Sequence, residues 1–131
     1  IRRIPRDARI LGVIRNPADR LVSSVRMMCR SVDQADEMLG KAIAGFDKSK
    51  ERIAYRVYAP QSSYAKISSR IKLFPFEMLS DLVRLTGWVK EIPHLNSART
   101  DLSSDVVKNR PLFNSALNTY KEDFNLYERR Y

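Results

Sequence analysis

The sequence predicts an α/β fold with a small sheet and a mostly helical later part, and three observations support this prediction. Residues 8–14 (Ala-Arg-Ile-Leu-Gly-Val-Ile) form a short, mostly apolar run, which is typical of a strand covered on both faces. A helix start follows at once, at Asn16-Pro17. A second run, residues 71–76 (Ile-Lys-Leu-Phe-Pro-Phe), predicts another strand, whose end Pro75 places at a sheet edge or strand terminus.

The first helix is predicted by the chemistry of its N-terminus. Asn16 can act as the N-cap, Pro17 fits the first helical position, and Asp19 lies near the positive end of the helix dipole. The apolar residues that recur at helical spacing after this start predict its buried stripe, which consists of Leu21, Val25, Met28 and Cys29.

A second helix is predicted from a capping box at residues 31–34 (Ser-Val-Asp-Gln). Its expected apolar face consists of Val32, Ala35, Leu39, Ala42, Ile43 and Phe46. The charged residues 48–52 then connect to a short helical stretch. Residues 60–63 (Pro-Gln-Ser-Ser) break the helical pattern and predict a loop.

The later part of the chain alternates helical and loop-like composition. A helix over residues 77–85 is expected to bury Met78, Leu82 and Leu85, with Thr86-Gly87 as its C-cap. Residues 92–104 have the composition of a loop, and Pro111 opens a last helix. Its continuation is aromatic and is expected to pack in the core, with coverage of an acceptor groove as the alternative; the residues are Tyr120, Phe124, Tyr127 and Tyr131.

Composition limits the class of protein and of partner. The 131 residues, 44% of them hydrophobic, suit a single domain spanning residues 1–131. A formal charge of +9 favours anionic partners, although a solvated basic surface explains it equally well. The single cysteine, Cys29, excludes an intrachain disulfide and a multi-cysteine zinc site. No metal centre is expected, and no apolar run is long enough for a transmembrane segment.

Arg15 and Ser23 are the candidate site residues. Arg15 follows the first strand, and ligands of open α/β sheets bind beyond the carboxyl ends of strands, near helix N-termini. A planar guanidinium donates two parallel hydrogen bonds to a phosphate, and the Ser23 hydroxyl adds a neutral donor. Arg20, one turn before Ser23, adds a second charge or pairs with a carboxylate. The alternative is a plain helix start with Arg15 at the surface.

Five segments in the same order resemble motifs of the sulfotransferases, most closely the carbohydrate-type branch. Residues 13–24 (Val-Ile-Arg-Asn-Pro-Ala-Asp-Arg-Leu-Val-Ser-Ser) resemble the family's 3′-phosphate-binding motif, Arg-x-Pro-x-x-Arg-x-x-Ser. The other four segments are residues 60–64 (Pro-Gln-Ser-Ser-Tyr), 76–79 (Phe-Glu-Met-Leu), 92–96 (Ile-Pro-His-Leu-Asn) and 120–127 (Tyr-Lys-Glu-Asp-Phe-Asn-Leu-Tyr). The resemblance covers residues 10–131.

This resemblance implies a P-loop-like sulfotransferase fold and the nucleotide donor 3′-phosphoadenosine 5′-phosphosulfate. The implied reaction transfers a sulfuryl group to a hydroxyl or amine acceptor, a carbohydrate in this branch, and leaves 3′-phosphoadenosine 5′-phosphate. Arg15 and Ser23, with Arg20, would then hold the 3′-phosphate and so bind and orient the donor. His94, the single histidine, falls in the fourth motif and is interpreted as structural or solvent-exposed, with a catalytic base as the alternative; the catalytic base stays unassigned.

The sequence departs from the family in one respect. The family's 5′-phosphosulfate loop, which carries a Lys beside Ser or Thr, has no counterpart in residues 1–131. We therefore expect an N-terminally incomplete domain, with a truncated, inactive homologue as the alternative. A further alternative is a non-catalytic basic module that binds polyanions, either nucleic acid or sulfated glycan. The early arginines favour this reading: Arg2, Arg3, Arg6 and Arg9.

Overall fold

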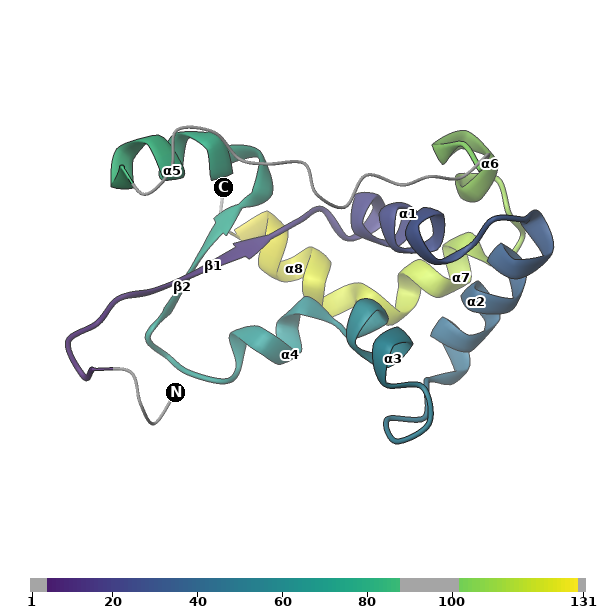
Figure 1. The fold of residues 1–131 in the computed structure, drawn as a ribbon, viewed down its shortest axis with the longest axis horizontal. Helices are drawn as coiled ribbons and strands as arrows, with labels where there is room; N and C mark the ends of the chain where they lie inside the picture. The colour runs from purple at the N-terminus through teal and green to yellow at the C-terminus, as the bar shows by residue number, and fades with distance from the viewer. Residues whose placement is uncertain (1–4, 88–101, 130–131) are drawn as a thin grey trace.

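The computed structural model describes residues 5–87 and 102–129 and joins a small parallel sheet to a mostly helical body (Figure 1). In chain order the elements are β1 (Ile10–Ile14), α1 (Pro17–Met28), α2 (Val32–Ala44), α3 (Arg52–Tyr58), α4 (Gln61–Ala65), β2 (Ile71–Pro75), η1 (Phe76–Met78), α5 (Leu79–Thr86), α6 (Ser104–Lys108), α7 (Phe113–Leu117), η2 (Asn118–Tyr120) and α8 (Lys121–Arg129). The expected α/β class, with a small parallel sheet and a mostly helical later part, is confirmed at this level.

The sheet consists of β1 and β2, which pair in parallel with Ile14 opposite Pro75. Pro75 ends β2, as predicted, because a residue without an N–H is tolerated at the end of a strand. Gly12 lies opposite Leu73, and a Cβ atom on Gly12 would lie 3.0 Å from Leu73 Cδ2. Glycine therefore allows the Leu73 side chain to lie directly against the β1 backbone.

Coverage of β1 on both faces was predicted and is wrong for the described residues. Only Ile14 of this strand is buried, and Val13 is 39% exposed. The apolar run indicates a strand, but burial depends on the layers packed against it. The sheet of the described chain has only two strands, and Figure 1 shows most helices gathered on the other side of the molecule.

The start of α1 follows the predicted chemistry. Asn16 Oδ1 accepts hydrogen bonds from the backbone N–H groups of Ala18 at 2.9 Å and Asp19 at 3.4 Å, and Pro17 occupies the first helical position. The predicted stripe is also confirmed, since Leu21, Val25 and Cys29 are buried and Met28 packs against the same core.

Two side chains cap the start of α2, but the second hydrogen bond differs from that of a reciprocal capping box. Ser31 Oγ accepts from Gln34 N at 3.2 Å, as predicted. Gln34 Oε1 accepts instead from Arg30 N, at 2.7 Å, one residue before the N-cap. Leu39 is buried as expected, whereas the expected burial of Ile43 is wrong, because this side chain is 41% exposed.

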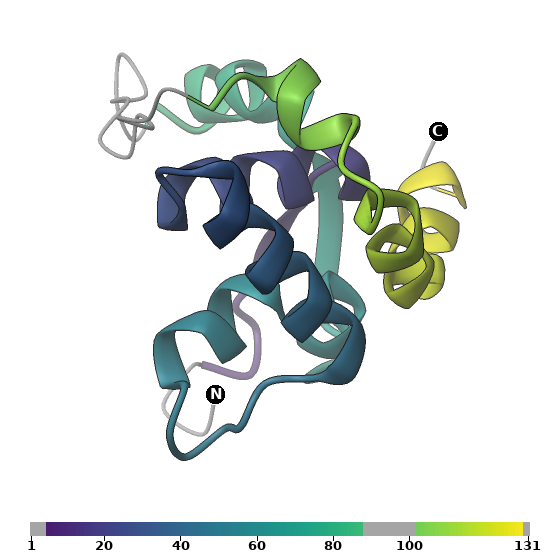
Figure 2. The same cartoon turned by 90° about the vertical axis from the view of Figure 1, so that its right-hand side faces the viewer.

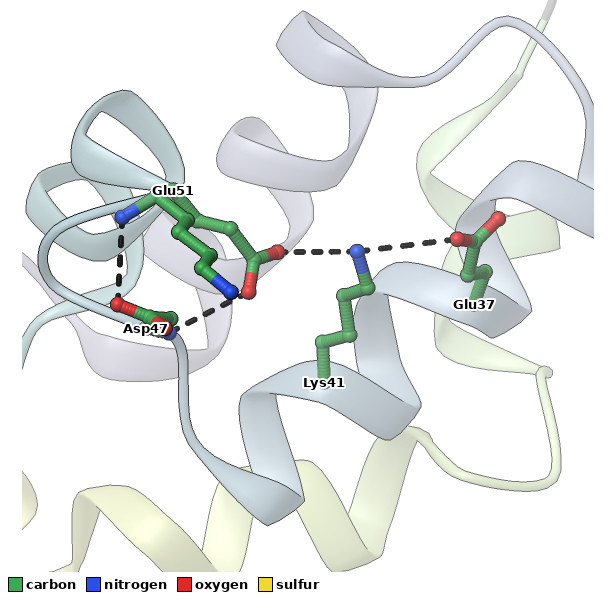
Figure 3. Close-up of polar contacts among 5 residues, drawn as sticks. Glu37, Lys41, Asp47 and Glu51 are labelled. Carbon is green, nitrogen blue, oxygen red and sulfur yellow. Dashed lines mark hydrogen bonds and ion pairs between the residues drawn. The ribbon is translucent and has the colours of Figure 1, made fainter.

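A charged network holds the connection between α2 and α3 (Figure 3). Lys41 Nζ lies 2.9 Å from Glu51 Oε2 and 3.8 Å from Glu37 Oε1. Asp47 Oδ1 accepts from both the N–H and the Oγ–H of Ser49, which tightens the turn. These contacts fix the path of the connection. They contribute little to stability, because the charged groups are largely exposed.

The hydrophobic core lies within the helical body, where α3 and α6 lie on opposite sides of α1 (Figure 2). Its buried members are Leu21, Val22, Val25, Cys29, Ala35, Leu39, Ala54, Tyr58, Leu102, Val107, Phe113, Ala116 and Tyr120. Arg110 clamps its edge, because its Nε and Nη2 lie 2.8 and 2.7 Å from the two carboxylate oxygens of Asp36.

One prediction about helices is wrong: residues 60–63 were expected to form a loop, but α4 begins at Gln61. The predicted loop over residues 92–104 lies mostly outside the described residues, and α6 begins at its last residue, Ser104. The last helix, predicted from Pro111, begins at Phe113 and is divided into α7, η2 and α8. The apolar spacing of α5 correctly indicated a helix with Gly87 as its left-handed C-cap (φ 69°).

The predicted burial along η1 and α5 is also wrong. Met78 is 46% exposed and Leu85 is 85% exposed, while Leu82 is only partly buried. Periodicity identifies an apolar face but not a partner for it, and α5 lies apart from the helical core in Figure 1. Within residues 5–87 and 102–129, no helix is both long and apolar enough to cross a membrane.

We expect Asn16→Ala to lower the free energy of unfolding by about 0.5–2 kcal/mol, because two α1 amide groups lose their acceptor. Urea denaturation followed by circular dichroism measures this change. Asn114→Ala, on the exposed face of α7, is the matched control and should leave stability unchanged or slightly higher. Equal effects at both positions would contradict the capping role.

The ion pair of Asp36 and Arg110 predicts an acid-sensitive term in stability. Hydrogen bonding to Arg110 holds the pKa of Asp36 below its ordinary value of 3.8. The stabilisation is therefore complete above that value and is lost as the pH falls through the lower pKa of the folded state. Asp36→Asn should flatten the dependence of the unfolding free energy on pH below about pH 5.

Candidate functional site

The candidate site begins where both strands end. Because Ile14 pairs with Pro75, the next residues, Arg15 and Phe76, leave the sheet at the same edge. The Arg15 Cζ atom lies 4.5 Å from the centroid of the Phe76 ring. The guanidinium therefore lies over the aromatic face, which fixes its orientation and leaves its N–H groups for an acceptor.

The backbone of Arg15 is held by one side chain from α4. Arg15 N–H donates to Gln61 Oε1 at 2.9 Å, and Gln61 Nε2 donates to Arg15 O at 3.0 Å. The carboxamide thus pairs with both the N–H and the C=O of Arg15, the first residue after the end of β1. The residue is fixed without help from a third strand.

The guanidinium of Arg15 has unused hydrogen-bonding capacity. Its Nε atom is buried and has no hydrogen-bond partner, and no ion pair involves this side chain in the part of the chain that the structure describes. A buried N–H group without an acceptor costs about 1–3 kcal/mol, so buried donors in native proteins nearly always have one. The arrangement suits an anion that accepts from the guanidinium.

Ser23 lies on α1, beyond the capped start of that helix. Its side chain is partly buried, and its hydroxyl has no hydrogen bond to any residue that the structure describes. Free amides at the helix N-terminus were expected to help hold the ligand, but Asn16 Oδ1 already accepts from the amides of Ala18 and Asp19. Side chains must therefore carry more of any anion recognition than the helix terminus does.

Arg20 has a partner within the protein. Its Nη2 donates to the backbone carbonyl of Val57 at 2.9 Å and so joins α1 to the end of α3. Arg20 was expected either to add a second charge to the site or to pair with a carboxylate. No carboxylate partner of Arg20 is found among the described residues. Its side chain also lines a hollow of about 310 Å³ beside the sheet, together with Gln61 and Tyr64.

A buried carboxylate places Gln61. Asp123 is completely buried, and its two oxygens accept from Gln61 N at 2.7 Å and from Ser62 N at 2.8 Å. These are the first two amides of α4, so Asp123 caps a helix that lies far from it in sequence. We call Arg15, Gln61, Phe76 and Asp123 the strand-end cluster.

Two tyrosines tie the closing segment to the rest of the site. Tyr120 Oη donates to Tyr58 O at 2.7 Å, and burial raises the pKa of Tyr120, so the phenol keeps the proton that it donates. Tyr127 Oη donates to Glu77 Oε1 at 2.9 Å, next to Phe76. Gln61 and Phe76 contact Arg15, and Asp123 contacts Gln61, so a chain of contacts links four of the five motif segments. The fifth segment, with His94, lies outside the described residues.

The sequence singled out Arg15 and Ser23 as candidates but did not indicate the contacts of Gln61 and Asp123. Gln61 was assigned to a loop, and Asp123 was only part of a motif. Their partners lie 46 and 62 residues away, so no local spacing could reveal them. Among residues 5–87 and 102–129, no group of three or more His, Cys, Asp or Glu side chains could hold a metal ion.

We expect Asp123→Ala to lower the free energy of unfolding by about 2–3 kcal/mol, because the buried amide of Ser62 and the partly buried amide of Gln61 lose their acceptor. Chemical denaturation measures the loss. Glu122→Ala is the matched control, since the neighbouring carboxylate is exposed and pairs with the exposed Lys66. A control variant as unstable as Asp123→Ala would contradict the capping role.

Comparison of this chain with family models, with curated proteins and with solved structures finds no match. Any function must therefore be argued from the residues of the site itself.

Proposed function

We propose that this chain is a sulfotransferase-type domain with a P-loop-like sulfotransferase fold. In this proposal it binds 3′-phosphoadenosine 5′-phosphosulfate and serves the transfer of its sulfuryl group to a hydroxyl or amine of an acceptor, a carbohydrate. The observation that carries the proposal is Arg15, whose guanidinium is fixed beyond the end of β1 with a buried Nε that lacks a partner among the described residues. A nucleotide phosphate would supply an anionic partner for this guanidinium, which makes no ion pair within the described residues.

The residues present suit the 3′-phosphate of this donor. Arg15 offers parallel N–H groups from a planar cation, and the partly buried Ser23 offers a neutral hydroxyl donor. Both belong to the β1–α1 unit, at the carboxyl end of the strand, where α/β proteins bind nucleotides. Arg20 adds positive charge nearby on the same helix, although one of its N–H groups is used by Val57 O.

Their contribution is to binding and orientation. A group that holds the 3′-phosphate acts at a distance from the reacting bond and has similar strength in the ground and transition states. The donor supplies the sulfuryl group when bound, and the acceptor supplies the nucleophile. Loss of Arg15 should therefore raise the KM for the donor more than it lowers kcat.

We expect the full chain to bind 3′-phosphoadenosine 5′-phosphate, and Arg15→Ala to weaken this binding by about 2–4 kcal/mol, or about 30- to 1000-fold in Kd. Ser23→Ala should cost less, about 1 kcal/mol, because it removes a neutral donor. Isothermal titration calorimetry measures both changes. Arg56→Ala is the matched control, since it removes the same charge from an exposed position on α3.

The 3′-phosphate is tested separately with adenosine 5′-phosphate, which lacks it. Wild-type protein should prefer the 3′-phosphorylated ligand, and Arg15→Ala should lose this preference. Binding that Arg15→Ala leaves unchanged would sink the proposal. A polyanion-binding module would instead bind DNA or heparin with steep salt dependence, and Arg15→Ala and Arg56→Ala would weaken that binding equally.

A further inference from the structure

We propose that Gln61 is a positioning residue for Arg15 and that Asp123 holds Gln61 in place. Anion binding at the strand end then depends on side chains from three separate segments of the chain. The identity of the anion rests on the proposed function. The positioning of the Arg15 side chain does not, because it follows from contacts within the protein.

The first step is the double hydrogen bond between Gln61 and the backbone of Arg15. One carboxamide accepts from Arg15 N–H at 2.9 Å and donates to Arg15 O at 3.0 Å. Rotation of the peptide on either side of Arg15 would break one of these bonds. The rotamers open to a side chain depend on its backbone angles. This pairing therefore restricts the directions in which the Arg15 side chain can leave the backbone.

The second step explains why Gln61 can act as a fixed clamp. A glutamine side chain has several free torsions, so it clamps well only if its own backbone is immobile. Asp123 supplies this immobility, since its buried carboxylate accepts from Gln61 N at 2.7 Å and Ser62 N at 2.8 Å. The start of α4 is thereby tied to α8, and Gln61 faces Arg15.

The third step concerns the far end of the Arg15 side chain. Phe76 lies against the face of the guanidinium, 4.5 Å from Cζ to the ring centroid. Arg15 is therefore constrained at its backbone by Gln61 and at its tip by Phe76, with the buried Nε between them. A side chain ordered before binding loses less entropy when the anion arrives, so affinity should depend on Gln61 even without direct contact.

A purely structural role for Gln61 makes a different prediction. If Gln61 only satisfies the backbone groups at the strand end, its loss would weaken any binding to the same extent whether or not the Arg15 side chain is present. If it acts through Arg15, its effect should disappear once that side chain is removed. A double-mutant cycle separates the two.

The cycle uses the full chain and calorimetric titration with 3′-phosphoadenosine 5′-phosphate. We expect Gln61→Ala to raise Kd about ten-fold in the wild-type background and less than about two-fold in the Arg15→Ala background. Gln61→Met, which has a similar length but makes no hydrogen bonds, should match Gln61→Ala and guards against a cavity effect. Gln34→Ala is the control, since Gln34 also accepts from a backbone N–H, at the start of α2.

A second readout does not need the nucleotide. The buried Arg15 Nε–H should exchange slowly with solvent, and Gln61→Ala or Gln61→Met should accelerate its exchange about ten-fold or more while the amide of the buried Leu39 is unaffected. Nitrogen-15 NMR measures both. Accelerated exchange without nucleotide binding by the wild type would support the positioning role and reject the proposed function.

The opposite results overturn the inference. If Arg15 Nε–H exchange is unchanged in both Gln61 variants, Gln61 does not position Arg15, whatever the nucleotide affinity. Equal losses of affinity in the wild-type and Arg15→Ala backgrounds would likewise assign Gln61 a structural role only.

Discussion

The capping of α4 by Asp123 is the constraint on which the candidate site depends. A buried carboxylate is stable only when its lost hydration is replaced, and two amide donors at 2.7 and 2.8 Å supply that replacement. The side chain of aspartate is short and has two acceptor oxygens, so it can serve two consecutive amides at once. The interaction joins α8 to the start of α4 and so determines where Gln61 lies.

From this contact the arrangement extends to the sheet. Gln61 fixes the backbone of Arg15, the parallel register of β1 and β2 brings Phe76 beside it, and Tyr127 holds the neighbouring Glu77. The contacts that hold Arg15 therefore come from outside the β1–α1 unit. The geometry of the candidate site is a property of the folded domain rather than of a local motif.

The features that the sequence could predict are those decided locally. The cap at Asn16, the buried stripe of α1 and the left-handed Gly87 each depend on residues within a turn or two. The start of α4 could not be predicted, because its cap comes from Asp123, 62 residues away. The exposure of Leu85 is a similar case: spacing identified an apolar face, but only the tertiary structure shows what covers it. The candidate site divides in the same way, since Arg15 was found from its place after a strand, and its partners were not.

The contacts of the strand-end cluster can serve stability as well as ligand binding, so the resemblance to sulfotransferase motifs has a purely structural explanation too. The contacts of Gln61 with Asp123 and of Arg15 with Phe76 stabilise the fold. A domain that binds no ligand could therefore keep these four residues for stability alone. The network by itself is therefore no argument for sulfuryl transfer. The Nε of Arg15 is different. An arginine with a purely structural role would gain stability if its Nε–H donated a hydrogen bond to a carbonyl or carboxylate oxygen, as the Nε–H groups of Arg26 and Arg110 do. The packing of the strand-end cluster therefore explains the position of Arg15 but supplies no acceptor for its buried Nε.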